Sequence, residues 1–528
     1  MIAPRVQTCR LRQPLLLAWK DEPTAAYVHL PFCKRKCRYC DFPVIAVGMG
    51  PPEGKTADNM QMYVDFVWQE IRATRRLNHS GPLETVFFGG GTPSLISLPL
   101  LEQIMRELES TFGIATGAEI SIEADPGTFD AARLRSYMSL GINRVSVGVQ
   151  AFQEDLLQLL GRGHDLRDVY RAIEAVYAAG VPSWSLDLMS GLPHLTPELW
   201  QRSLESAVDA DPHHLSTYDL QVEEHTPFAR LYRPGERPLP ADDVAAAMYC
   251  TASSVLRGAG FEHYEVSNYA KPGHRCAHNM VYWEGKPFYG IGMGSASYLQ
   301  GRRFSRPKRL HGYRQFVEEF AIYGSLGGTA GGADSSARSS SSSGSSSSSS
   351  RSSNSNSGIH GGAAHQNPAD DEGVGAVPGL HLPPETSHDK LLDTIMLRLR
   401  LADGLDLSSI QGRNADGEQL RSVVLRALQP HIEQGLVQFR PIQADTALNS
   451  ADSSPSRGGP NSPQGRSEGL ELQQQTQQEQ RARGLLTSGQ HGAGEAAVVS
   501  LTDPEGFVVS NDIISDVFAA LDEGSADS

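Results

Sequence analysis

Hydrophobic residues follow two alternating patterns over the first 320 or so residues. Short apolar runs, typical of strands, occur at residues 26–30, 85–88, 119–123, 144–149, 184–189 and 214–220. Between them, apolar residues at helical spacing predict helices over residues 60–76, 98–112, 131–140, 166–179 and 198–209. This alternation favours parallel strands joined by helical crossovers. Because these strands are two short of a closed eight-stranded barrel, we predict an α/β fold: a partial, three-quarter TIM-type barrel of about six parallel βα units. Residues 264–269 predict a further strand at its edge.

Two stretches lose this periodicity and contain few apolar residues. One is rich in Gly and Ser, and the other in Ser, Gly, Pro and Gln, so neither can bury enough apolar surface to offset its ordering entropy. They predict a disordered linker and a disordered insertion. The predicted order is an N-terminal extension, the barrel with its extension, the linker, a C-terminal domain, the insertion, the rest of that domain and a tail: 1–23, 24–322, 323–385, 386–442, 443–496, 497–521 and 522–528.

The sequence pattern of the C-terminal domain predicts a small α+β module. Helical spacing covers residues 389–401 and 417–429, and strand patterns cover 435–439 and, as the remnant of a hairpin, 498–501 with 507–509. Helices followed by a hairpin are typical of a winged-helix-like fold. The module is not basic, so we expect it to pack on the barrel or cover a substrate, and not to bind DNA.

The charge balance excludes some classes of partner. The 46 Lys and Arg residues face 61 Asp and Glu residues, which gives a formal charge of −15 and argues against a nucleic-acid partner. No apolar run reaches about 18 residues, so we expect no membrane-spanning helix. The first 20 residues contain Arg5, Arg10, Arg12 and Lys20 but no acidic residue, a composition compatible with organellar targeting. We therefore expect the cytoplasm or an organelle, either mitochondrion or plastid.

Three of the six cysteines, Cys33, Cys37 and Cys40, form a C-x3-C-x2-C segment directly after the first strand. Such clustering indicates metal binding in a reducing compartment and not a disulfide framework. Three thiolates can hold three irons of a [4Fe-4S] cluster and leave the fourth iron open to a ligand. A structural zinc site needs four ligands, and His29 is the local candidate for the fourth, so a zinc-stabilised structural protein is an alternative.

Polar or glycine residues lie at the ends of the other predicted strands. The run 89–91 is all glycine, Glu123 ends the third strand, Gln150 follows the fourth, and Asp187 lies near the end of the fifth. In a barrel these ends share one rim, where active sites form, so one pocket can contain them all. Each residue taken alone also fits an ordinary polar loop.

The segment 27–42 resembles the signature of the radical S-adenosylmethionine (SAM) superfamily. The resemblance implies a [4Fe-4S] cluster whose open iron chelates SAM, and an electron donor that triggers SAM cleavage to methionine and a 5′-deoxyadenosyl radical. Within the superfamily, six motifs are similar to the oxygen-independent coproporphyrinogen III oxidase group: residues 27–33, 88–94, 121–127, 147–152, 161–164 and 187–193.

This resemblance also implies roles for individual residues. Tyr27, Gly90 and Glu123 match the SAM site, where Glu123 accepts hydrogen bonds from the SAM amine or ribose. The residues that match a second SAM site in the oxidase branch are Gly91, Thr92, Gln150, Arg162, Asp187 and Asp219.

Two features distinguish the branches of this group. The oxidase resemblance predicts a fourth cysteine two residues after Cys40, where this chain has Phe42. The block His278-Asn-Met-Val-Tyr-Trp instead resembles the haem-chaperone branch, the HemW-like proteins. This implies haem as a ligand, with His278 as an iron ligand and Cys276 as its rival. Taken alone, His278 is better explained as a histidine hydrogen-bonded in a loop, without a ligand role.

We therefore predict a radical SAM-type haem chaperone that binds a [4Fe-4S] cluster, SAM and haem and passes haem to haem-accepting proteins, membrane-bound ones included. The enzyme alternative is oxidative decarboxylation of coproporphyrinogen III by a 5′-deoxyadenosyl radical, which Phe42 disfavours.

Overall fold

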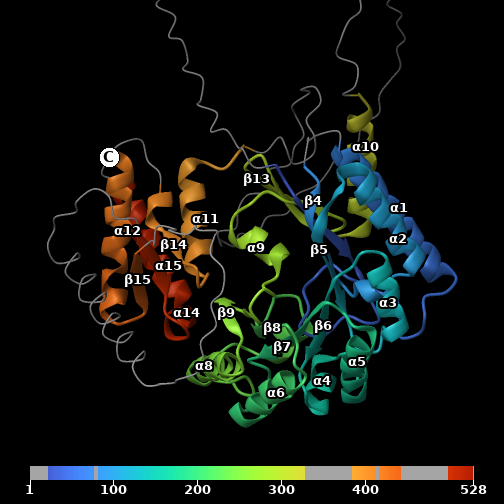
Figure 1. Cartoon of the computed structure of the whole chain (residues 1–528), viewed down its shortest axis with the longest axis horizontal. Helices are drawn as coiled ribbons and strands as arrows, with labels where there is room; N and C mark the ends of the chain where they lie inside the picture. The colour runs from blue at the N-terminus through green and yellow to red at the C-terminus, as the bar shows by residue number, and fades with distance from the viewer. Residues whose placement is uncertain (1–21, 76–80, 327–382, 411–414, 442–496, 527–528) are drawn as a thin grey trace, which may run out of the picture.

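A nine-stranded sheet forms the first unit of the computed structural model, which describes residues 22–75, 81–326, 383–410, 415–441 and 497–526 (Figure 1). The strands in spatial order are β11 (Tyr289–Ile291), β1 (Ala25–Leu30), β4 (Leu83–Gly90), β5 (Ile114–Ala124), β6 (Arg144–Gln150), β7 (Ser183–Ser190), β8 (His214–Asp219), β10 (Asn268–Ala270) and β9 (Glu262–Glu265). All neighbours from β11 to β8 are parallel. Among the described strands β11 and β9 do not pair, so the barrel is open, and the predicted fold class is confirmed.

Helices cover the outer face of this sheet (Figure 1). They are α1 (Lys55–Arg75), α2 (Leu98–Phe112), α3 (Ala131–Ser139), α4 (Glu154–Leu160), α5 (Leu166–Ala179), α6 (Pro197–Asp209), α8 (Asp242–Gly258) and α10 (Leu310–Leu326). The short helix α7 (Pro227–Leu231) instead contacts the cysteine loop, where the Phe228 amide donates to the Arg38 carbonyl at 3.0 Å. Side chains alternate along each strand, so Val86, Ile122 and Val147 point outward into the helix layer and are fully buried there. The inner face is left to the polar residues between them.

The inner face is closed by segments that follow β8 in the chain. Helix α9 (Ala277–Trp283) packs against β4, and a hairpin of β12 (Ala296–Leu299) and β13 (Arg302–Ser305) follows β11. A small parallel pair, β2 (Phe32–Cys33) and β3 (Ile45–Ala46), brackets the cysteine loop. No helix within the described ranges is long and apolar enough to cross a membrane.

The C-terminal module has its own apolar core. Its elements are α11 (Ser387–Leu399), β14 (Leu405–Asp406), α12 (Ala415–Glu433), β15 (Val437–Pro441), β16 (Ala497–Leu501), α14 (Glu505–Val508) and α15 (Ser510–Ala526). The strands form an antiparallel sheet in the order β14-β16-β15. Helices and an antiparallel sheet together make this an α+β module. The module packs on the barrel edge, where the Ala402 amide donates to the Tyr264 carbonyl at 3.0 Å.

Two elements of this module differ from prediction. Residues 507–509 are not a hairpin strand, because Phe507 and Val508 belong to the short helix α14. The Phe507 amide donates to the Thr502 carbonyl at 3.1 Å, and the Phe507 side chain is buried in the module core. Three consecutive apolar residues fit a strand or a helix equally well. Residues 522–526, predicted as tail, belong to α15.

Other differences lie at the barrel edge and at the predicted boundaries. Residues 262–270 form the two strands β9 and β10 where one strand was predicted. Helix α10 runs to Leu326, four residues into the predicted linker. The rest of that linker as far as residue 382, the insertion 443–496 and residues 1–21 of the N-terminal extension lie outside the described residues.

Candidate functional site

The cysteine loop is anchored to the carboxyl-terminal rim of the barrel. Cys33 ends β2, while Cys37 and Cys40 lie in the loop before β3. Backbone hydrogen bonds hold this loop at both sides: the Val47 amide donates to the Cys33 carbonyl at 2.8 Å, and the Arg38 amide to the Leu160 carbonyl at 2.9 Å. The three thiols are therefore presented by a loop that the barrel holds in place.

Two polar side chains reach the sulfurs, Thr92 from the turn after β4 and Arg162 from the turn between α4 and α5. The Thr92 hydroxyl lies 3.7 Å from Cys33 Sγ, and Arg162 Nη1 lies 3.5 Å from Cys37 Sγ. Arg162 is buried and also pairs with Asp125. Burial raises the pKa of Cys33 to about 12. A buried guanidinium beside the loop favours thiolates, because it offsets part of their negative charge.

The donor set fits an iron–sulfur cluster better than a zinc ion. His29, the predicted fourth zinc ligand, has both ring nitrogens engaged: Nε2 with the Pro43 carbonyl at 3.1 Å and Nδ1 with the Tyr27 hydroxyl at 3.2 Å. Within the described residues, no three His, Cys, Asp or Glu side chains converge on one metal-ion position. A cubane bonds each thiolate through a separate iron, so three thiols suffice without meeting at one atom.

The glycine run lets β4 approach the cysteine loop. Gly90 has φ +112°, and a Cβ there would lie 2.4 Å from the His29 ring. A Cβ on Gly91 would lie 2.7 Å from the Phe32 carbonyl oxygen. The Gly90 amide also donates to the Glu123 carboxylate at 3.0 Å. The Gly91 amide donates to the Leu30 carbonyl at 2.9 Å, so the amides of Gly90 and Gly91 are engaged and the run is required for close packing.

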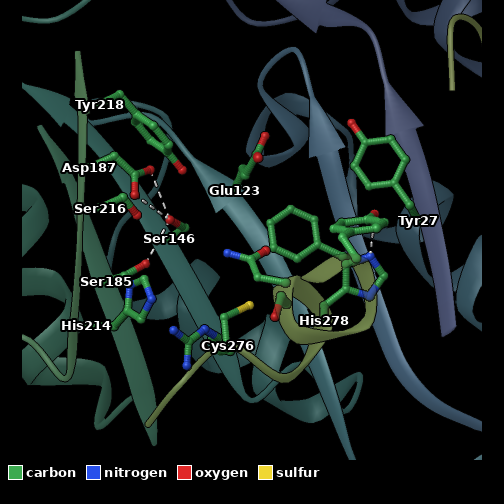
Figure 2. A pocket seen from close by; sticks show the side chains of 15 residues that line it. Tyr27, Glu123, Ser146, Ser185, Asp187, His214, Ser216, Tyr218, Cys276 and His278 are labelled. Atoms are coloured by element: carbon green, nitrogen blue, oxygen red, sulfur yellow. Dashed lines mark hydrogen bonds between the residues drawn. The ribbon is translucent and has the colours of Figure 1, made fainter. Parts of the chain in front are cut away.

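A cavity of about 200 Å³ lies inside the barrel. Its lining includes five of the predicted residues: Tyr27 on β1, Glu123 on β5, Asp187 on β7, Cys276 directly before α9 and His278 on α9 (Figure 2). Figure 2 shows Glu123 and Tyr218 at one side and His214 and Cys276 at the other. The remaining lining residues are Phe87, Ser121, Arg144, Ser146, Ser185, Ser216, Asn279 and Tyr282.

Two buried carboxyl groups occupy one side of the cavity. Burial, and then the charge of Asp187, raises the pKa of Glu123 to about 8. Burial also raises the pKa of Asp187, which accepts hydrogen bonds from the Ser146 hydroxyl at 3.0 and 3.1 Å. Buried carboxyl groups of this kind favour a cationic ligand, since a positive charge stabilises the ionised form.

Gln150 and Asp219 lie at strand ends, outside the lining of the cavity. Gln150 ends β6 with φ +70°, a left-handed conformation that is uncommon for a residue other than glycine. The Asp219 carboxylate accepts from the Ser190 hydroxyl at 3.0 Å and joins the ends of β8 and β7. Their predicted contacts with a second SAM therefore remain predictions.

The structure does not favour His278 as an iron ligand. Its Nδ1 lies 2.8 Å from the Thr85 hydroxyl and its Nε2 lies 2.8 Å from the Tyr282 hydroxyl, so both nitrogens are engaged. The ring stacks on Phe87 and is 1% exposed. Burial lowers its pKa to about 3. The rival ligand Cys276 is also buried, with its sulfur 3.5 Å from a Glu119 oxygen.

Comparison with known proteins establishes the family. Residues 27–207 match the radical SAM superfamily, and residues 386–441 match the HemN C-terminal domain. The chain is 47% identical to "Heme chaperone HemW" of Synechocystis over 57% of this chain and 72% of that protein. It is 36% identical to "Heme chaperone HemW" of Escherichia coli, over 55% of this chain and 75% of that one. The chain belongs to the HemW family.

Other relatives fit the HemW assignment. The mouse protein "Radical S-adenosyl methionine domain-containing protein 1, mitochondrial" is 35% identical over 55% of this chain and 64% of its own length. The solved structure of coproporphyrinogen III oxidase (HemN) from Escherichia coli is similar at a TM-score of 0.57 and 21% identity, over 79% of this chain and 85% of that one. That likeness confirms the barrel and the module as a shared fold.

Sequence reasoning missed several residues of this HemW-family site. Asp125 is one, because it receives both the Thr92 hydroxyl and the Arg162 guanidinium. Others line the cavity from the inner faces of the strands: Ser121, Arg144, Ser146, Ser185, His214 and Ser216. Polar residues at every second position of β5 to β8 were the available signal, since such a period marks one face of a strand.

Proposed function

We propose that this chain is a haem chaperone that binds a [4Fe-4S] cluster and SAM, takes up haem and passes it to haem-accepting proteins. The 47% identity to a HemW haem chaperone over most of that protein carries the proposal. The cysteine loop supports it, because Phe42, which is 58% exposed, replaces the fourth cysteine that the oxidase resemblance predicts. Acceptors include membrane haem proteins, and the location is the cytoplasm or an organelle.

Each part of the site has a distinct role in this proposal. Cys33, Cys37 and Cys40 hold the cluster, which, with SAM and one electron from a donor protein, supplies a 5′-deoxyadenosyl radical in this superfamily. Arg162 offsets cluster charge from its position 3.5 Å from Cys37. Glu123, fixed by the Gly90 amide, accepts hydrogen bonds from SAM, and Tyr27 lines the same cavity.

Haem uptake and transfer test this function directly. Anaerobically reconstituted protein is titrated with haem by absorbance, and the loaded protein is then mixed with a haem-free acceptor such as an apo-cytochrome. We expect a saturable haem complex that is depleted as acceptor spectra appear. No saturable binding would remove the chaperone role. Protoporphyrinogen formation from coproporphyrinogen III with SAM and a reductant would instead select the oxidase.

SAM binding is expected to depend on pH through Glu123. At pH 7 this carboxyl, with its pKa near 8, is mostly protonated, and a cationic ligand beside it favours the carboxylate. Binding should therefore release up to about one proton, and the affinity should rise with pH until about pH 8. Calorimetry in buffers of different ionisation enthalpy measures that proton release.

The control for this experiment is Glu318→Gln, which changes a half-exposed carboxylate on α10. It should keep the proton release of the wild type, whereas Glu123→Gln should bind SAM more weakly and without pH dependence between pH 6 and 8. Equal proton release from Glu123→Gln and wild type would show that another group titrates.

His278 is expected to support the fold and not to ligate iron. His278→Ala removes two buried hydrogen bonds and a stacked ring, so it should lower the free energy of unfolding by about 2–4 kcal/mol. The spectrum of bound haem should stay unchanged in folded His278→Gln and in Cys276→Ser. A shift of the Soret band in one of these two variants would identify that residue as the ligand.

A further inference from the structure

Three buried polar atoms in the cavity have no hydrogen-bond partner among the described residues. They are Arg144 Nη2, Ser121 Oγ and His214 Nδ1. The three residues are 4%, 1% and 2% exposed, and all of them line the cavity. Burying a polar atom without a partner is costly, so a cluster of such atoms indicates a ligand that satisfies them.

The register of the sheet places these residues in two adjacent rows of the inner face. Ser121 lies opposite Arg144 in the β5–β6 pair. His214 lies opposite Ser185, one row nearer the carboxyl ends of the strands, because Arg144 pairs with Ser183 and Ser146 pairs with Ser185. Two residues farther along β5 lies Glu123, toward the cysteine loop. Arg144, Ser121 and His214 supply the donor-rich side of the cavity, and Figure 2 shows His214 away from Glu123.

The donor-rich side carries a positive charge that is only partly balanced. Arg144 Nη1 donates to the Ser183 hydroxyl and the His274 carbonyl, both at 3.1 Å, and lies 3.8 Å from the nearest Glu119 oxygen. The Glu119 carboxylate already accepts the His278 amide at 3.0 Å. Arg144 Nη2 has no partner among the described residues, and Arg144 lines the cavity.

The other two groups can also act as donors. His214 Nε2 lies 2.8 Å from the Tyr264 hydroxyl, and when that hydroxyl donates, Nδ1 of the neutral ring carries the proton. The Ser121 hydroxyl rotates freely to donate. One guanidinium and two neutral donors that line one cavity suit a carboxylate, which accepts up to four hydrogen bonds.

We propose that Arg144, Ser121 and His214 form a carboxylate-binding subsite, and that its ligand, on the basis of the function proposed above, is a propionate side arm of haem. The cavity volume of about 200 Å³ suits an arm and not a macrocycle, since one water occupies about 30 Å³. SAM also carries a carboxylate, so the experiment must separate the two sources.

Haem and its dimethyl ester, which lacks the carboxylates, are titrated into wild-type protein and into Arg144→Gln and Ser121→Ala. We expect Arg144→Gln to weaken haem binding roughly 10- to 100-fold and Ser121→Ala roughly 3- to 10-fold. The ester should bind wild type and variants with equal, lower affinity. SAM affinity should not change in either variant.

Ser121→Ala keeps the test independent of folding, because the Ser121 hydroxyl has no described hydrogen bond to lose. The matched control is Ser203→Ala, a buried serine of α6 outside the cavity, which should bind haem as wild type does. Equal affinity for haem and ester in wild type would overturn the subsite and leave the chaperone role intact. A loss of SAM affinity in Arg144→Gln would overturn the haem assignment.

If wild type fails to bind haem at all, the proposed function fails first. The subsite is then tested with propionate alone, as a rise in melting temperature on adding the anion. A rise in wild type that is absent in Ser121→Ala would support a carboxylate subsite, and no rise in wild type would overturn it.

Discussion

Replacing Cys37 by serine should abolish cluster binding. Reconstituted wild type should contain about four irons and four sulfides per chain, because three thiolates complete the protein's share of a [4Fe-4S] cluster. A serine hydroxyl is a much poorer ligand for this iron, and two thiolates do not hold the cube. Iron and sulfide analysis of anaerobic protein, with its visible absorbance, measures the loss. Cys33→Ser and Cys40→Ser should behave in the same way.

Cys250→Ser provides the matched control. Cys250 lies on α8 and is partly exposed, as the three loop cysteines are, but it lies outside the loop. This variant should keep its full iron content and should unfold at the same temperature as wild type. Full iron in Cys37→Ser would contradict the assigned ligand set, while loss of iron from Cys250→Ser would show that α8 contributes a ligand.

The barrel could be predicted from sequence because short hydrophobic runs, typical of strands, alternate repeatedly with segments of helical spacing. All six predicted strands exist, and α2 and α5 have the predicted bounds, Leu98–Phe112 and Leu166–Ala179. Strand β11 was missed, since three residues are too few to show a period. Its pairing with β1 is also a long-range contact that no local pattern encodes.

The candidate site also contains residues that the sequence identified and residues that it did not. Motifs identified residues whose chemistry is rare, such as the cysteines and Glu123, but not the ordinary serines beside them. Whether His278 is free or engaged depends on Thr85, 193 positions away, and on Tyr282, one helical turn along α9. Sequence could show that a histidine and a tyrosine share one face of a helix, but not that Thr85 would face them from β4.

Glu70→Gln should destabilise the protein by about 3–5 kcal/mol, because it leaves a buried guanidinium without its counter-charge. Glu70 is fully buried, and its Oε1 lies 2.7 Å from Arg306 Nε. Its Oε2 accepts from the Tyr313 hydroxyl at 2.6 Å and from the Gly292 amide at 2.8 Å. This network joins α1 to α10 and to the end of β11, so its loss affects three elements together. Urea denaturation measures the change in the free energy of unfolding.

The exposed pair Arg314–Glu318 on α10 is the matched control for the buried pair Arg306–Glu70, because its N–O distance is also 2.7 Å. Glu318→Gln should lower the free energy of unfolding by less than about 1 kcal/mol, since solvent screens both charges.

The effect of Glu70→Gln should also reach the cluster site. The Tyr63 hydroxyl accepts the Met293 amide at 3.0 Å and donates to the His29 carbonyl at 2.8 Å, four residues before Cys33. Iron should therefore dissociate faster from Glu70→Gln than from Glu318→Gln, and equal rates would show that the buried pair stabilises the barrel without positioning the cysteine loop.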